Sequence, residues 1–162
     1  MGLLKKIVLI CLISSLIISV PTGIYIYNNR SRTPEQTVRE YTKGLLKAYQ
    51  SLKISDISKY VAMQQYYEDK NQLATLQRDK IKLAAKLKKQ TLANKVITGS
   101  SATVEMSENW VFHFVNIETN QPAGADRETY YIISYQLKKN TIKGWQIIKS
   151  SAISYDLGTV KK

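Results

Sequence analysis

Residues 128–139 read ETYYIISYQLKK and residues 144–155 read GWQIIKSSAISY, with NTIK between them. In the first run aromatic and β-branched residues recur at every second position, and in the second run Trp145 and Ile147 continue the pattern. Alternation with a period of two, interrupted by a short segment that contains Asn and ends at Gly144, predicts two β-strands joined by a turn. The chain is therefore expected to end in a pair of antiparallel strands.

Two more runs with this period precede the pair. They cover residues 91–98 and 102–117 and are separated by residues 99–101 (GSS), and a longer loop at residues 120–126 (NQPAGAD) leads to the next strand. Gly, Pro, Asn and Asp at these places are typical of turns. The second half of the chain therefore predicts a curved antiparallel sheet of about four meander strands.

The preceding segment has the period of helices. Residues 33–36 (TPEQ) predict a helix start, with Thr33 as the N-cap and Gln36 at the capping-box position, and the helix is expected to end near Leu52. A short second helix is predicted around residues 54–61 and a long third one from Gln65 to Gln90. The third helix would bury Leu73, Leu76, Leu83, Ala84 and Leu87. Three helices packed on a sheet make an α+β architecture.

The N-terminal residues predict a membrane anchor. Residues 7–27 carry no charge and would reach about 31 Å as a helix, which matches a hydrocarbon core of about 30 Å. A cleavable signal peptide is the alternative, although a small-residue cleavage site is poorly matched here. Lys5 and Lys6 are nearly balanced by Arg30 and Arg32, and we expect the N-terminus to be cytoplasmic. This localisation is a single pass through the cell membrane with the C-terminal domain extracytoplasmic.

The boundaries follow from these elements. Residues 1–28 form the cytoplasmic tail and transmembrane anchor, 29–33 a linker, 34–156 one cone-like α+β domain, and 157–162 a basic C-terminal tail. The formal net charge is +12, which favours an anionic surface or an acidic partner and says little about chemistry. The chain has one cysteine, so no intrachain disulfide can form.

The order of elements resembles one superfamily. The residues that carry the resemblance are Trp110-x-Phe112, the run from Tyr130 to Leu137, and Gly144-Trp145-x-Ile147-Ile148. Over residues 33–156 the chain is similar to the nuclear-transport-factor-2-like (cystatin-like cone) superfamily, in its membrane-anchored extracytoplasmic form. Similar membrane-anchored members include periplasmic scaffolds of type IV secretion and the intermembrane-space domains of plastid and cyanobacterial division proteins. The resemblance implies a cone that serves mainly for protein contacts.

Catalytic members of that superfamily carry an Asp or His that points into the cone. Here His113 is the one weak catalytic candidate, since an imidazole partly buried in a strand can act as a general base, and a hydrogen-bonded core histidine is the competing interpretation. No catalytic residue is assigned. A single His and a single Cys give no metal site and no cofactor is expected. The candidates for lining a ligand pocket are Trp110, Phe112, His113, Tyr131, Tyr135 and Trp145.

Four basic residues would form a stripe on the predicted third helix. They are Arg78, Lys82, Lys86 and Lys89. A solvated outer face is one interpretation, and docking to anionic head groups is the other, since each cation near such a surface contributes about 1 kcal/mol. Nucleic acid is not expected as a partner, because the lysines are not interleaved with the aromatic residues of a single-strand binder.

Taken together, the sequence predicts a non-enzymatic interaction or assembly domain in an envelope complex. Its partners would be the membrane and either another protein or further copies of itself. One alternative is a cone that binds a small apolar ligand, or acts like an isomerase or dehydratase, and another is binding to anionic lipid through the basic helix. A filled interior would favour the first function and an open cavity reached by His113 the second.

Overall fold

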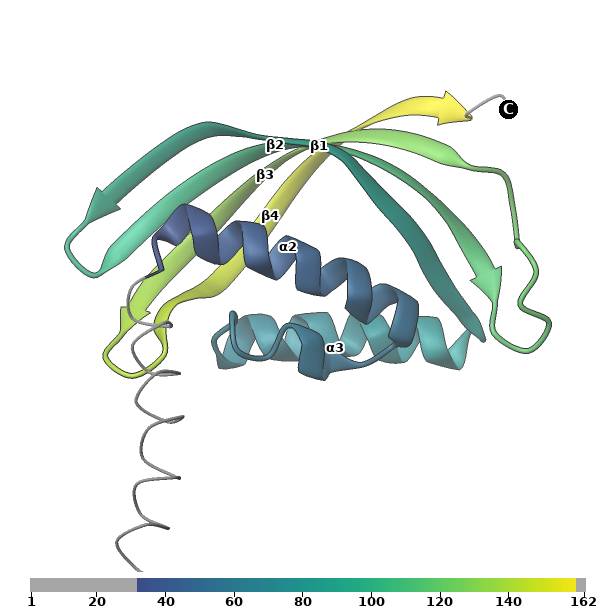
Figure 1. Ribbon diagram of the computed structural model, residues 1–162, viewed down its shortest axis with the longest axis horizontal. Coiled ribbons are helices and arrows are strands. Elements are labelled where there is room, and N and C mark those ends of the chain that lie inside the picture. The colour runs from purple at the N-terminus through teal and green to yellow at the C-terminus, as the bar shows by residue number, and fades with distance from the viewer. Residues whose placement is uncertain (1–31, 160–162) are drawn as a thin grey trace, which may run out of the picture.

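The computed structural model describes residues 32–159. They form two α-helices, one short 3₁₀ turn and four strands. In chain order these are α2 (Pro34–Ser51), η1 (Ile54–Asp56), α3 (Met63–Arg78), β1 (Ile81–Thr98), β2 (Ser101–Asn116), β3 (Arg127–Asn140) and β4 (Gly144–Thr159). Figure 1 shows the strands as an arch, with both helices on its concave side.

The sheet is an antiparallel meander in the order β1-β2-β3-β4. Its strands are 14 to 18 residues long, well above the usual five or six. Long strands twist and bend, and β1 has two register irregularities, between Leu87 and Lys89 and between Leu92 and Asn94. The curvature creates the concave face on which the helices pack.

The first helix begins as its sequence predicts. Thr33 accepts a hydrogen bond from the Gln36 backbone nitrogen at 3.1 Å, and the Gln36 side chain accepts one from the Thr33 backbone nitrogen at 2.8 Å. Pro34 occupies the first turn, where its missing N–H costs nothing. The helix ends at Ser51, and its C-cap Leu52 has a φ of 56° in the left-handed region.

The core fills one end of the arch. Its buried side chains come from both helices, the segment between them and strands β2 to β4. They are Val38, Tyr41, Ala48, Ile57, Tyr60, Val61, Leu73, Ala102, Val104, Met106, Tyr135, Leu137, Trp145 and Ile147. Backbone hydrogen bonds join the segment after η1 to the sheet, since the Ala62 nitrogen donates to the Ile147 oxygen at 2.8 Å and the Ile147 nitrogen to the Tyr60 oxygen at 2.9 Å.

The predicted three helices are wrong. The second is only the 3₁₀ turn Ile54–Asp56, and the third ends at Arg78, after which Lys80 turns the chain at a φ of 54° and β1 starts. The error has a physical cause: Leu83 and Leu87 are four residues apart, which is one face of a helix and equally one face of a strand. Pairing with β2 decides between them.

The predicted transmembrane helix is also not seen among the described residues. No helix within residues 32–159 is long and apolar enough to cross a membrane. Residues 7–27, on which the anchor was predicted, lie outside the described part of the chain.

Candidate binding cavity

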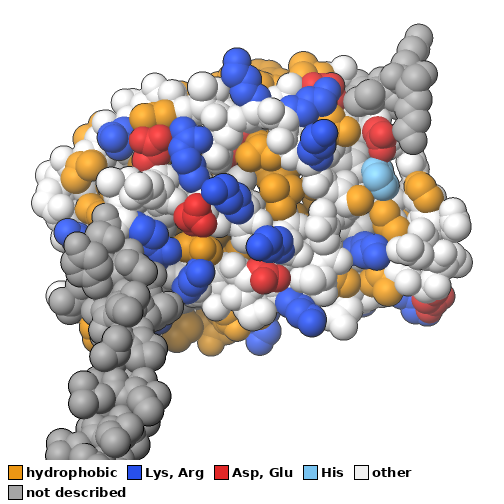
Figure 2. Space-filling model, in the orientation of Figure 1, with side chains coloured by type: hydrophobic (Ala, Val, Ile, Leu, Met, Phe, Trp, Pro, Cys, Tyr) orange, Lys and Arg blue, Asp and Glu red, His pale blue; other side chains and the backbone are white. Residues whose placement is uncertain are grey.

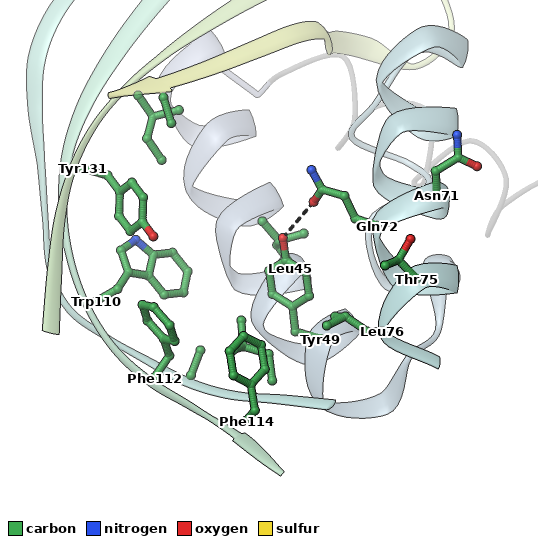
Figure 3. A pocket seen from close by; sticks show the side chains of 14 residues that line it. Leu45, Tyr49, Asn71, Gln72, Thr75, Leu76, Trp110, Phe112, Phe114 and Tyr131 are labelled. Atoms are coloured by element: carbon green, nitrogen blue, oxygen red, sulfur yellow. Dashed lines mark hydrogen bonds between the residues drawn. The ribbon is translucent and has the colours of Figure 1, made fainter. Parts of the chain in front are cut away.

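A cavity of about 760 Å³ lies between the helices and the concave face of the sheet, beside the core. We call it the binding cavity. Its walls come from α2, α3 and all four strands (Figure 3). The lining residues are Leu45, Tyr49, Asn71, Gln72, Thr75, Leu76, Leu83, Ala85, Trp110, Phe112, Phe114, Tyr131, Ile133 and Ala152. This volume is within the usual range for small-ligand sites.

The sheet wall of the cavity is aromatic. Trp110, Phe112 and Phe114 are spaced two apart on β2, so a strand directs all three side chains to the same side. The rings of Phe112 and Phe114 meet edge to face, with centroids 6.4 Å apart, and Tyr131 of β3 stands next to Trp110 (Figure 3). Exposure rises from 8% at Trp110 to 38% at Phe114, so this wall extends from the interior to the mouth.

The helix wall is polar but uncharged. Asn71, Gln72 and Thr75 of α3 line the cavity, and the Gln72 side chain points across it toward the sheet (Figure 3). The Tyr49 hydroxyl of α2 donates a hydrogen bond to Gln72 Oε1 at 3.1 Å. Burial, together with the negative charge of Asp69 and with Tyr131, raises the pKa of Tyr49 to about 12. Tyr49 is therefore a neutral hydroxyl at physiological pH and is not a base.

A buried carboxylate lies next to the aromatic wall. Glu108 is fully buried on the concave face of β2. Its carboxylate accepts hydrogen bonds from Gln90 Nε2 and Trp110 Nε1, both at 2.8 Å, and from the Tyr135 hydroxyl at 3.3 Å. Burial raises the pKa of Glu108, and these hydrogen bonds oppose the rise. Glu108 holds the wall in place without reaching the cavity.

A second buried carboxylate, Asp69, lies on α3. Both of its oxygens are 3.1 Å from the Tyr41 hydroxyl, and Oδ1 also accepts a hydrogen bond from Gln65 Nε2 at 2.9 Å. Burial raises the pKa of Asp69 as well. The Tyr41 and Tyr135 rings meet edge to face at 6.1 Å, which connects the two polar clusters through the core. Among the described residues no group of three or more His, Cys, Asp or Glu could hold a metal.

The six residues that the sequence proposed for a pocket fall in three places. Trp110, Phe112 and Tyr131 line the binding cavity. Tyr135 and Trp145 are core residues, 2% and 6% exposed. His113 lies on the opposite face of β2, where its Nδ1 is 2.8 Å from Asp126 Oδ1. The open cavity is therefore present, and His113 does not reach it.

The four basic residues do not form a helical stripe. Arg78 closes α3 and pairs with Asp79 at 3.1 Å, whereas Lys82, Lys86 and Lys89 belong to β1. Lys82 Nζ donates a hydrogen bond to Asn120 Oδ1 at 3.0 Å. On the face shown in Figure 2, Lys and Arg side chains are spread among hydrophobic and acidic ones and do not gather into one patch.

Sequence reasoning missed both buried carboxylates and the polar helix wall. A signal for Glu108 was present, because it shares the inward parity of Met106 and Trp110 on β2. Asp69, Asn71, Gln72 and Thr75 gave no such signal, since polar residues on a helix are ordinarily assigned to its solvated face.

No protein-family model matches the chain. No curated protein is significantly similar to it. Solved structures do share its fold. The intermembrane-space region of the chloroplast protein ARC6 superposes with a TM-score of 0.67 at 16% identity, over 77% of this chain and 97% of that one. A conserved protein from Planctomyces limnophilus superposes with a TM-score of 0.53 at 13% identity, over 76% and 97%.

The fold thus places the chain in a class of small α+β domains with helices beneath a curved antiparallel sheet. Sequence identities this low establish the fold alone, because unrelated functions share folds. Membership of the nuclear-transport-factor-2-like superfamily is not established by these similarities.

Proposed function

We propose that this protein is a membrane-attached, non-enzymatic interaction domain of an envelope complex. In this proposal the binding cavity receives an uncharged, mostly apolar group carried by a partner in that complex. The observation that carries the proposal is the chemistry of the cavity wall, which is aromatic on the sheet side and amide-bearing on α3.

The wall excludes charged ligands. Its lining residues include no Lys, Arg, Asp, Glu or His, so an ion entering the cavity would lose its hydration without meeting a counter-ion. Burying an unpaired charge is strongly unfavourable, whereas an apolar body contributes about 25 cal/mol for each Å² removed from water. A single hydrogen-bonding group on the ligand could face Asn71, Gln72 or Thr75.

The same wall argues against an enzyme. General acid–base catalysis needs a group whose pKa lies near the working pH within reach of the substrate. Among the described residues that line the cavity, the hydroxyls of Tyr49, Thr75 and Tyr131 are the nearest to such a group, and the pKa of Tyr49 is raised to about 12. Glu108 is not among the residues that line the cavity, and its carboxylate accepts a hydrogen bond from Trp110 Nε1.

Attachment to an envelope membrane has two supports. The uncharged residues 7–27 are long enough to hold the domain beside a bilayer. The ARC6 region that shares the fold occupies an intermembrane space. The proposal also includes membership of the nuclear-transport-factor-2-like superfamily and an extracytoplasmic orientation of the domain.

A pair of neutral substitutions on one strand tests the cavity. The full chain, in detergent, is titrated with N-phenyl-1-naphthylamine, an uncharged fluorescent probe with an apolar body. Ala85→Phe fills the cavity and should weaken binding at least about tenfold, or about 1.4 kcal/mol. Ala84→Phe, on the opposite face of β1, is the matched control and should bind like the parent. Equal binding by the two variants would reject the cavity as the site.

The sulfonated analogue 8-anilinonaphthalene-1-sulfonate tests the charge requirement. It has the same rings plus one negative charge. Ala85→Phe should reduce the fluorescence of the sulfonate much less than it reduces the fluorescence of the neutral probe. A larger cavity-dependent signal from the sulfonate would contradict the proposed preference for uncharged groups.

A further inference from the structure

The two edges of the sheet differ in how they are protected against pairing with other strands. Edge strand β1 has the two register irregularities and five lysines, which are Lys82, Lys86, Lys88, Lys89 and Lys95. Bulges and lysines are the features by which natural sheets prevent edge-to-edge association. The β1 edge is therefore blocked.

Edge strand β4 is protected only in its first half. There the parallel bridge between Val61 and Ile147 covers the edge. Beyond Lys149 no described residue pairs with the outer side of β4, and its pairing with β3 is regular from Ser150 to Asp156. Residues 150–155 (SSAISY) contain no charge, Pro or Gly, in a chain with a net charge of +12. This segment has none of the protection found in β1.

The unprotected segment also carries apolar side chains on the convex face. Ile153 and Tyr155 are 62% and 50% exposed, and Leu157, two residues beyond the segment, is 57% exposed. Ile132 of β3 is paired with Ile153, and the Tyr130 ring lies 6.1 Å from the Tyr155 ring. Both helices lie on the concave side, so among the described elements none covers this strip (Figure 1).

We infer that the second half of β4 pairs with the same segment of a second copy of this chain. The two strands run antiparallel about a twofold axis at Ile153, the midpoint of Lys149 and Leu157. Such an interface is isologous, so Ile153 opposes Ile153 and Ser151 opposes Tyr155. The unpaired backbone groups become hydrogen-bonded, and the two apolar strips become continuous.

Charge favours this self-pairing at this place. The charged residues of the paired stretch, Lys149 and Asp156, stand near its two ends and none lies within residues 150–155, so the twofold axis sets no like charges opposite each other. With Lys149 opposite Leu157, the two Lys149 positions are eight residues apart along the strands, or about 27 Å. This exceeds the screening length of about 8 Å at physiological salt. The same operation on β1 would bring its lysines together.

The affinity of one β4 strand for another is modest, and attachment to a membrane compensates for it. One strand pair and its flanking side chains form a smaller interface than the 1,200–2,000 Å² that is typical of stable complexes. Copies held in one membrane have a raised effective concentration. This last step rests on the proposed function, whereas the pairing geometry does not.

Disulfide trapping in vesicles tests the inference. Full-length protein that carries both Cys11→Ser and Ile153→Cys is reconstituted into vesicles and mildly oxidised. Cross-strand Cβ atoms at about 4.5–5.5 Å, close to disulfide spacing, should give mostly disulfide-linked dimers. Val96→Cys, 54% exposed on the blocked β1 edge, is the matched control and should give few. Equal yields from the two variants, or no dimer from Ile153→Cys, would overturn the inference.

A mixing experiment checks register and separates the two proposals. Chains with Ser151→Cys mixed with chains with Tyr155→Cys should form mixed dimers, and adding Ile153→Lys to both should lower that yield several-fold. Ile153→Lys should leave binding of the neutral naphthylamine probe unchanged, because Ile153 faces away from the cavity. In chains without Ile153→Lys, dimers that do not bind the probe would reject the proposed function alone. Chains that bind the probe but form no dimers would reject the dimer alone.

Discussion

The indole nitrogen of Trp110 donates a hydrogen bond to Glu108 Oε2 over 2.8 Å, between positions two apart on the same strand. A cavity wall is thereby fixed to a buried carboxylate that has no cationic partner among the groups bonding it. The orientation of the aromatic wall depends on this bond, which leads to the first two predictions.

Trp110→Phe should lower the free energy of unfolding. The substitution keeps an aromatic ring but leaves a buried carboxylate oxygen without its donor, at a cost of about 1–3 kcal/mol. Urea denaturation measures the change. Trp145→Phe is the control, since it removes the same ring volume from a core residue that bonds no carboxylate. If both substitutions cost the same, ring volume and not the hydrogen bond would account for the loss.

Glu108 should make stability depend on pH in a defined direction. Burial raises its folded pKa above the ordinary 4.5, so between 4.5 and the raised value the folded state holds more protons than the unfolded state. The free energy of unfolding therefore falls as the pH rises through that window. In Glu108→Gln the decrease in the free energy of unfolding with rising pH should be smaller. The decrease that remains is the contribution of Asp69.

Chemical denaturation at a series of pH values compares the two proteins. Asp69 contributes equally to both, so the difference between the curves isolates Glu108. A parent protein whose stability rises with pH relative to Glu108→Gln would contradict a raised folded pKa.

Gly44→Ala should destabilise the protein, although alanine is the better helix former by about 1 kcal/mol. A Cβ at Gly44 would lie 2.6 Å from the backbone oxygen of Asp56, where η1 packs against α2. Forcing this contact apart should cost about 1–3 kcal/mol. Thermal unfolding is the measurement, and Lys47→Ala, exposed on the same helix, should be close to neutral. Stabilisation by Gly44→Ala would show that α2 and η1 can accommodate a Cβ at this position.

Gln72→Leu should change which ligands the cavity prefers. The amide of Gln72 is one of the few polar groups on the helix wall. Its loss should weaken binding of 1-naphthol relative to naphthalene by roughly fivefold, about the contribution of one neutral hydrogen bond. Displacement of the neutral probe measures both ligands, and naphthalene is the internal control. An unchanged ratio would place the polar group of the ligand elsewhere.

Much of the sheet could be predicted because its signals are local. Alternation in residues 128–139 and Gly144 at the turn indicated β3 and β4 directly. The start of β1 could not be predicted, because KLAAKLKK satisfies helical and strand spacing together and only pairing with β2 distinguishes them. Strong helix formers such as Ala, Leu and Lys favoured the wrong choice, and tertiary context overrode them.

The cavity was predictable only in part for the same reason. The parity of Trp110 and Phe112 places them on one face from sequence alone. Whether that face is filled depends on where α3 lies, and the pairing of Val61 with Ile147 just before this helix joins segments far apart in the sequence. His113 was misjudged because a strand gives no indication of which of its two faces is concave.

Native mass spectrometry of the full-length protein, extracted gently from its own membrane, tests the central claim most directly. The parent and Ala84→Phe should each carry a partner or an uncharged adduct of defined mass, and Ala85→Phe should lose it. A protein-sized partner would support the assembly role, and a small adduct would favour the ligand-binding alternative at the same site. If the bound species is retained in Ala85→Phe, or none is found in any of the three, the cavity is not where this protein binds.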